Sequence, residues 1–339
     1  MGSSRFKDQL LASASRPCYN HSIKGTYIRI VKTRQFRYPL PERSFPNMPT
    51  SRLVTFNDRS PHARSPFFDS SEPALGVLNP REGSRHFRLL RYSPAPELSP
   101  YVRHYWSVEW DLTDSDPYLQ EVVPNPCVNL VIEPGRTFFY PPSPARFAYL
   151  QQGRGQVFGV KFHPGGFYPF LQASLSEQKG RPVSVESVLP ITGAELEKLL
   201  LTSGSQGPIT MIEQIEHLLI QSLPLLDEET VLLRQITERI AADRDLTRVD
   251  EVCRLFHIEK RTLQRLFSRR VGLSPKWTIR LHRLQEAAEA LDRGASDGFL
   301  PGLQHLSSEL GYHDQTHFTK DFKAIVGVTP EAYAQGIRG

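Results

Sequence analysis

Apolar residues change their spacing along this chain, and the changes divide it into four parts. Residues 1–75 show no sustained apolar periodicity, so we expect a disordered tail, with Met48 as an alternative start of the natural chain. Residues 76–183 contain short apolar runs ended by Pro and Gly, which predict a small β-barrel or β-sandwich. From 184 to 243 apolar residues recur every three or four positions, which predicts a helical connector.

The last part, residues 244–339, contains one pattern twice, at an offset of 55 residues. Residues 262–275 and 317–330 both have an apolar residue, a Phe four positions later, and then Val-Gly-apolar-Ser/Thr-Pro. A repeat at a fixed offset marks a duplicated structural unit. The apolar pairs, which end at Phe267 and Phe322, each lie on one face of a helix. Each copy therefore has the features of the second helix of a helix-turn-helix.

The surroundings of the two copies agree with this interpretation. Gly272 and Gly327 suit the left-handed conformation found at helix C-termini. A short amphipathic segment precedes each copy, and a longer one, residues 276–291, separates them. We therefore predict a chain of class α+β, with a C-terminal all-α domain of two helix-turn-helix units joined by a long helix. Such units place their second helix in the major groove of DNA.

Residues 248–293 and 302–333 resemble the DNA-binding domain of the AraC/XylS family of bacterial transcription regulators. The resemblance is carried by Gly311-Tyr312-His313-Asp314-Gln315-Thr316-His317-Phe318-Thr319-Lys320-Asp321-Phe322-Lys323, and by Gly327-Val328-Thr329-Pro330 and Tyr333 after it. The first unit departs from the family pattern, which usually has Gly in place of His257 and Ser in place of Glu259. The resemblance implies a rigid spacer helix and sequence-specific reading of two adjacent major-groove segments, about 34 Å apart.

Outward positions on the two second helices are the candidate DNA contacts. Arg and Gln make bidentate contacts to guanine and adenine, and the resemblance places base readers at these same positions. We expect base contacts from Arg261, Gln264, Arg265, Gln315, Thr316 and Thr319. We expect phosphate contacts from Arg269, Arg270, Lys320 and Lys323. Asp314 suits a helix N-cap better than a DNA contact.

The distribution of charge favours the same region. The net charge is +5, but residues 1–83 hold 13 Lys/Arg against 6 Asp/Glu, which leaves 28 against 30 in the remaining chain. Overall charge is therefore no evidence for nucleic-acid binding. Residues 254–283 hold nine Lys/Arg and one acid, Glu259. Such a cluster on a helix-turn-helix is the pattern expected for neutralising phosphates.

The segments 99–102, 124–130 and 162–167 resemble an uncharacterised domain that precedes this DNA-binding domain in some bacterial regulators. No known ligand comes with that resemblance. We expect the domain to sense an unknown small-molecule effector or to oligomerise. Duplex DNA, RNA polymerase and a second copy of the chain are the macromolecular partners that this interpretation implies.

Other chemistry is weakly represented. Three Cys, at positions 18, 127 and 253, form no CxxC site and exclude the adaptive-response DNA methyltransferase, a rival class that needs a four-cysteine zinc site. His104 or His163 could bind a metal, but no second ligand has matching strand spacing, so a structural role is favoured. The aromatic residues proposed for an effector pocket, which plain core packing would also explain, are Tyr105, Trp106, Trp110 and Phe162.

We accordingly predict no enzyme activity, no cofactor and no metal. No apolar run approaches 18 residues and no signal sequence is present, which favours a cytoplasmic bacterial protein. An architectural DNA-binding protein without an effector remains the alternative to a regulator.

Overall fold

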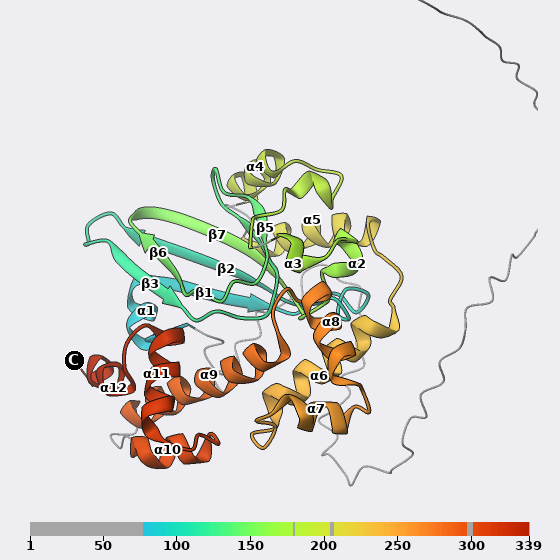
Figure 1. The fold of residues 1–339 in the computed structure, drawn as a ribbon. Helices are drawn as coiled ribbons and strands as arrows, with labels where there is room; N and C mark the ends of the chain where they lie inside the picture. Colours follow the sequence, from blue (N-terminus) through green and yellow to red (C-terminus); the bar gives the residue numbers. More distant parts are fainter. Residues whose placement is uncertain (1–76, 179, 204–206, 297–300, 339) are drawn as a thin grey trace, which may run out of the picture. The chain divides into compact units, whose positions relative to one another are not determined.

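The computed structural model describes residues 77–339, except 179, 204–206, 297–300 and 339 (Figure 1). The predicted tail, residues 1–75, and Met48 lie outside the described residues. In the part that is described, no helix is both long and apolar enough to cross a bilayer.

A five-stranded antiparallel sheet forms the centre of the first half, with the strand order β1-β2-β7-β4-β5. A separate two-stranded antiparallel sheet pairs β3 with β6. The strands are β1 (Phe87–Tyr92), β2 (Val102–Leu112), β3 (Tyr118–Val122), β4 (Asn129–Ile132), β5 (Phe138–Tyr140), β6 (Phe147–Gln151) and β7 (Gly153–Phe162). The expected β-rich domain is present and its sheets are antiparallel, but its described strands do not close into a barrel, because edge strands β1 and β5 do not pair.

Helices, rather than a second large sheet, cover one face of the five-stranded sheet. Tyr105 and Phe162 point to this face and share a core with Ile212, Ile215 and Leu219, which recur at helical spacing. The helices preceding and within this part are α1 (Pro80–His86), α2 (Tyr168–Leu171), α3 (Leu175–Gln178), the 3-10 helix η1 (Val185–Ser187), α4 (Gly193–Ser203) and α5 (Pro208–Gln221). Because helices bury this face, the small sheet does not have to close into a barrel to shield its apolar residues.

The opposite face of the sheet holds the indoles of Trp106 and Trp110. Each lies over a glycine of β7, since a Cβ at Gly159 or Gly155 would stand 2.1 Å from the facing ring. Successive residues of a strand point to opposite faces, so Tyr105 and Trp106 cannot line one cavity. The four aromatic residues predicted for an effector pocket are therefore divided between two faces, with Tyr105 and Phe162 fully buried in the core.

The predicted connector, residues 184–243, does not behave as one element. Helices α4 and α5 belong to the core of the sheet, whereas α6 (Glu228–Ala242) contributes Leu233, Ile236 and Ile240 to the core around Phe267. The connector is thus divided between its two neighbours, and α6 is structurally the first helix of the C-terminal half.

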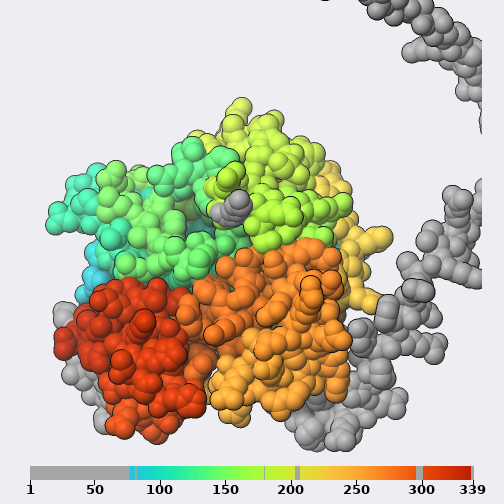
Figure 2. Space-filling model, in the orientation of Figure 1, coloured from blue at the N-terminus to red at the C-terminus, as the bar shows by residue number. Residues whose placement is uncertain are grey.

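The C-terminal half is all helical, and its two helix-turn-helix units lie toward opposite ends of α9 (Figure 1). Its further helices are α7 (Val249–Leu255), α8 (Lys260–Arg270), α9 (Pro275–Ser296), α10 (Leu303–Glu309), α11 (Gln315–Val326) and α12 (Pro330–Arg338). Ile279 of α9 belongs to the core of the first unit, and Leu284 and Leu291 belong to the core of the second. In Figure 2 the first unit is orange and the second is red.

Candidate nucleic-acid interface

The first helix-turn-helix unit consists of α7 and α8, which meet at a tight turn. The turn places His257 in the left-handed region, with φ of 49°, and the Ile258 N–H donates to the Cys253 carbonyl over 3.0 Å. Leu263 and Phe267 of α8 are fully buried, as their spacing predicts. His257 therefore adopts the conformation for which glycine is usually required, so the departure from the family pattern leaves the turn intact.

The second unit, α10 and α11, closes its turn in the same way. Gly311 is left-handed, with φ of 71°, and the Tyr312 N–H donates to the Ser307 carbonyl over 2.9 Å. The Asp314 carboxylate then caps α11 by accepting from the His317 N–H at 2.7 Å, as the sequence predicts. The buried Phe318 follows Gly311 by seven residues, whereas Leu263 follows His257 by six, so the second turn is one residue longer.

Both second helices end where the repeat predicts. Gly327 caps α11 with φ of 96°, and Gly272 follows α8 with φ of 82°. The Gly272 N–H donates to the Phe267 carbonyl at 2.9 Å, and the Gly327 N–H donates to the Lys323 carbonyl at 2.9 Å. These bonds satisfy carbonyl groups that a helix terminus otherwise leaves unpaired.

Most of the predicted base-contacting side chains are exposed. Thr319 alone among the six is half-buried, and Gln315 lies 3.4 Å from the carboxylate of Glu331 on α12. The exposed members are Arg261, Gln264 and Arg265 on α8, and Gln315 and Thr316 on α11. Lys320 and Lys323, predicted to contact phosphate, are exposed as well. Each second helix thus presents a polar face opposite its buried apolar stripe.

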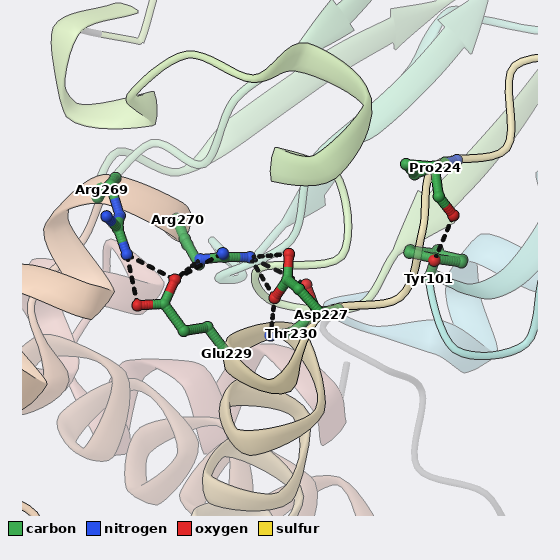
Figure 3. A network of polar contacts seen from close by, with 7 residues as sticks. All are labelled: Tyr101, Pro224, Asp227, Glu229, Thr230, Arg269 and Arg270. Carbon is green, nitrogen blue, oxygen red and sulfur yellow. Dashed lines mark hydrogen bonds and ion pairs between the residues drawn. The ribbon is translucent and has the colours of Figure 1, made fainter. Parts of the chain in front are cut away.

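The side chain of Arg270, from which we expected a phosphate contact, is only 6 % exposed (Figure 3). Its Nε donates to Glu229 at 2.8 Å, and another guanidinium nitrogen donates to Asp227 and Thr230, each at 3.0 Å. The guanidinium also lies over the ring of Tyr168, 4.3 Å from its centroid. Arg270 therefore anchors the end of α8 to the beginning of α6 and to α2.

Arg269 lies beside this network and is half-exposed. One of its nitrogens stands 2.6 Å from each carboxylate oxygen of Glu229 (Figure 3). A phosphate contact by Arg269 would therefore compete with Glu229. Figure 3 also shows that the loop before α6 is tied to the residue before β2, where the Tyr101 hydroxyl donates to the Pro224 carbonyl over 2.8 Å.

Asp321 and Arg283 support the second unit from inside. Asp321 lies 3.4 Å from Arg280 of α9 and accepts from the Tyr312 hydroxyl at 3.3 Å, so it faces the spacer helix. Arg283 of α9 donates to the Leu310 carbonyl and stacks over the Tyr312 ring, 4.1 Å from its centroid. Helical periodicity did not identify Arg283 as a support for the turn. The periodicity describes α9 alone, whereas the partners of Arg283 lie in the turn after α10.

The electrostatics of this support follow from burial. Burial raises the pKa of the Tyr312 hydroxyl well above its ordinary value, and the neighbouring Asp321 acts in the same direction. Burial likewise lowers the pKa of Arg283, which the charges of Asp321 and Glu251 partly oppose. Tyr312 therefore remains a neutral donor over the whole working pH range.

Two helix-turn-helix units whose turns close with equivalent backbone hydrogen bonds, built on one long helix, define a tandem helix-turn-helix DNA-binding domain. A family model described as a helix-turn-helix domain matches residues 252–336, and one described as a domain of unknown function (DUF6597) matches residues 90–184. The chain therefore carries a C-terminal helix-turn-helix domain, preceded by a DUF6597 domain.

Solved structures give weaker likenesses. The C-terminal domain of AraT, a response regulator from Geobacillus stearothermophilus, is 21 % identical with a TM-score of 0.29, over 32 % of this chain and 88 % of that one. ToxT from Vibrio cholerae is 12 % identical with a TM-score of 0.32, over 75 % of this chain and 100 % of that one. Unsaturated fatty acid-bound ToxT from the same organism is 11 % identical with a TM-score of 0.33, over 74 % and 95 %. TM-scores of this size do not establish a shared fold, and a search of curated proteins found no match.

Proposed function

We propose that this protein is a sequence-specific DNA-binding transcription regulator that reads two adjacent major-groove segments. The observation that carries the proposal is the pair of second helices with exposed Arg, Gln, Thr and Lys side chains, supported by equivalent turns. Helix α9 has 22 residues, so it is about 33 Å long. That length is suited to holding two reading helices one DNA turn, about 34 Å, apart.

The proposed contacts keep their sequence-based assignment except at Arg270. Arg261, Gln264 and Arg265 of the first unit, together with Gln315, Thr316 and Thr319 of the second, would contact base edges. Lys320 and Lys323 would contact phosphates, and Arg269 would do so when it leaves Glu229. We propose no DNA contact for Arg270, because its guanidinium is buried against Asp227 and Glu229.

The DUF6597 domain would then sense an effector or hold a second copy of the chain. We propose no catalytic role, since a regulator needs none. We also propose that the protein acts in the cytoplasm, where bacterial DNA lies. RNA polymerase is a proposed partner because transcription regulators act on it. The alternative, an architectural DNA-binding protein, would bind duplex DNA without preference between sequences.

Selection of binding sites from random or genomic duplexes with the purified full-length protein tests the proposal. We expect a motif with two half-sites whose centres lie about 10 base pairs apart. Its scrambled version, at the same length and salt concentration, is the control. Equal affinity for selected and scrambled duplexes would support the architectural alternative and refute the proposed regulator.

A further inference from the structure

A row of polar side chains crosses the five-stranded sheet on the face that carries Trp106. The strand register places His104 of β2 opposite Lys161 of β7, Lys161 opposite Asn129 of β4, and Asn129 opposite Tyr140 of β5. Residues opposed in this way have Cβ atoms about 4.5–5.5 Å apart. His104 is 4 % exposed and Lys161 is 8 % exposed. The row therefore brings an ammonium group, an imidazole and an amide together, and the first two are shielded from bulk water.

Spacer helix α9 lies near this row and carries a second imidazole. Its Gln285 side chain donates to the Pro124 carbonyl over 3.1 Å, which places α9 against the loop that leads into β4. His282, one turn earlier on α9, experiences the positive charges of Lys161 and Arg103. Burial, followed by these charges, lowers the pKa of His282 to about 4. His282 is thus a neutral hydrogen-bonding group beside the sheet.

Positive charge in this cluster is not balanced by a carboxylate. In the described residues, no carboxylate lies within ion-pair distance of the Lys161 ammonium. The titratable groups that act on His104 are Lys161, Arg103, Arg91 and His163. Burial lowers the pKa of Lys161 to about 8, and the Cys127 thiol is the group that opposes this shift. Burial also keeps the pKa of His104 well below its ordinary value.

Arg270 provides the contrast. That buried guanidinium has two carboxylates and a hydroxyl as partners, whereas the buried ammonium of Lys161 has no acceptor among the described residues. A buried charge without a partner is unfavourable, so such groups usually have a counter-charge when they act. A bound anion would supply the missing counter-charge.

We propose that His104, Lys161 and Asn129 of the sheet, together with His282 of α9, bind an oxyanion of a small molecule, either a carboxylate or a phosphate group. Lys161 supplies the charge, and the imidazole N–H groups supply directed hydrogen bonds. The Asn129 amide nitrogen donates to the Cys127 carbonyl at 3.4 Å, so its second N–H is the one that faces the anion. An anion held here joins the DUF6597 domain to the helix that spaces the two reading units. The proposal relies on the proposed function only for this consequence, because the binding itself involves no DNA.

Calorimetry and thermal unfolding of the full-length protein test the site without DNA. Acetate and inorganic phosphate are titrated in separate experiments, with sodium chloride at matched ionic strength as the reference. We expect saturable binding, and a rise in Tm beyond that in chloride, for at least one of the two anions. A response to acetate alone identifies a carboxylate ligand, and a response to phosphate alone identifies a phosphate ligand.

Variants locate the site. Lys161→Met should weaken anion binding about tenfold or more, while it keeps the near-ultraviolet circular dichroism of the fold. His282→Gln should weaken binding too, because the site spans both domains. Lys198→Met, at an exposed position on α4, is the matched control and should bind as the wild type does.

Two results would overturn the proposal: no saturable response to either anion beyond that to chloride, or equal responses of Lys161→Met and the wild type. Neither result affects the site-selection experiment, so failure of the anion site and failure of the DNA-binding function are distinguishable. Lys161→Met also removes an unpaired buried charge, so it should be at least as stable as the wild type in chloride.

Discussion

Replacement of Arg270 by Ala tests most directly whether this side chain serves the fold or the DNA. The change removes a guanidinium that joins the end of α8 to Asp227, Glu229 and Thr230 at the start of α6, and that stacks on Tyr168. It leaves both carboxylates without their shared partner. The helical face that contacts DNA in the proposed function remains unchanged.

The magnitude follows from the exposure of the groups involved. Loss of one partner from a buried ion pair costs about 3–5 kcal/mol. Here the side chains of Asp227 and Glu229 are 40 % and 44 % exposed and can regain water, so we expect a smaller loss, about 2–3 kcal/mol. In a chain of this size each kcal/mol lowers Tm by about 2–4 °C, so the drop should be roughly 5–10 °C.

Thermal unfolding followed by circular dichroism measures this effect, with Arg265→Ala as the matched control. Arg265 is exposed on the same helix, so its loss should change stability by no more than about 0.5 kcal/mol. The assignment of Arg270 would be refuted if Arg270→Ala kept the wild-type Tm but bound every duplex more weakly, with a salt slope reduced by about 1. That result would restore the phosphate contact expected from the sequence.

Three further predictions concern other parts of the chain. Gln264→Ala or Arg265→Ala should each cost about 1–3 kcal/mol at the preferred site and relax preference at one or two base pairs, as measured by fluorescence anisotropy; equal weakening on every sequence would indicate phosphate contact instead. Burial raises the pKa of the Glu289 carboxyl from an ordinary 4.5 to about 7, so the stability of the protein should fall as pH rises from 4.5 through 7. Glu289→Gln should therefore raise Tm above pH 7 and leave Tm unchanged below pH 4.5. An equal change in Tm in both pH ranges would contradict this. Phe322→Ala should cost about 3–5 kcal/mol and abolish specific binding, with hydrogen-exchange protection lost across α10 to α12 and kept in α7 and α8; loss across both units would mean that the domain unfolds cooperatively.

The repeat made the helix-turn-helix units predictable, because the spacing of their apolar residues is set by the geometry of a single helix. Leu263, Phe267, Phe318 and Phe322 are all fully buried, as helical periodicity predicts. The left-handed conformation of Gly327 follows from the same pattern. These features are set within a few residues of each other, so a single sequence contains the information needed to predict them.

The repeat also contained a signal against the phosphate assignment of Arg270. An offset of 55 residues places Arg270 opposite Ile325, which is 2 % exposed in the second unit. Arg270 therefore occupies a core position of the duplicated pattern, with a charged side chain. Its partners, Asp227 and Glu229, lie about 40 residues earlier in the chain, and periodicity within one helix cannot reveal them.

The architecture of the β-rich domain was less predictable for a similar reason. Short strands separated by Pro and Gly are compatible with a barrel, a sandwich or an open sheet. The choice depends on what covers each face, and here residues such as Met211 and Leu219 of α5 cover one of them. The same dependence divides Tyr105 from Trp106, since neighbouring residues on one strand serve different layers.

Helix α9 is part of each unit that it separates. Ile279 packs in the core with Phe267, Leu284 packs with Phe322, and Arg283 supports the turn before α11. A spacer that contributes core residues to both units holds each second helix in a definite position along one rigid element. A displacement of α9 from the sheet side, where Gln285 bonds to Pro124, would therefore move both reading helices together. This arrangement favours joint movement of the two units over a change in their separation.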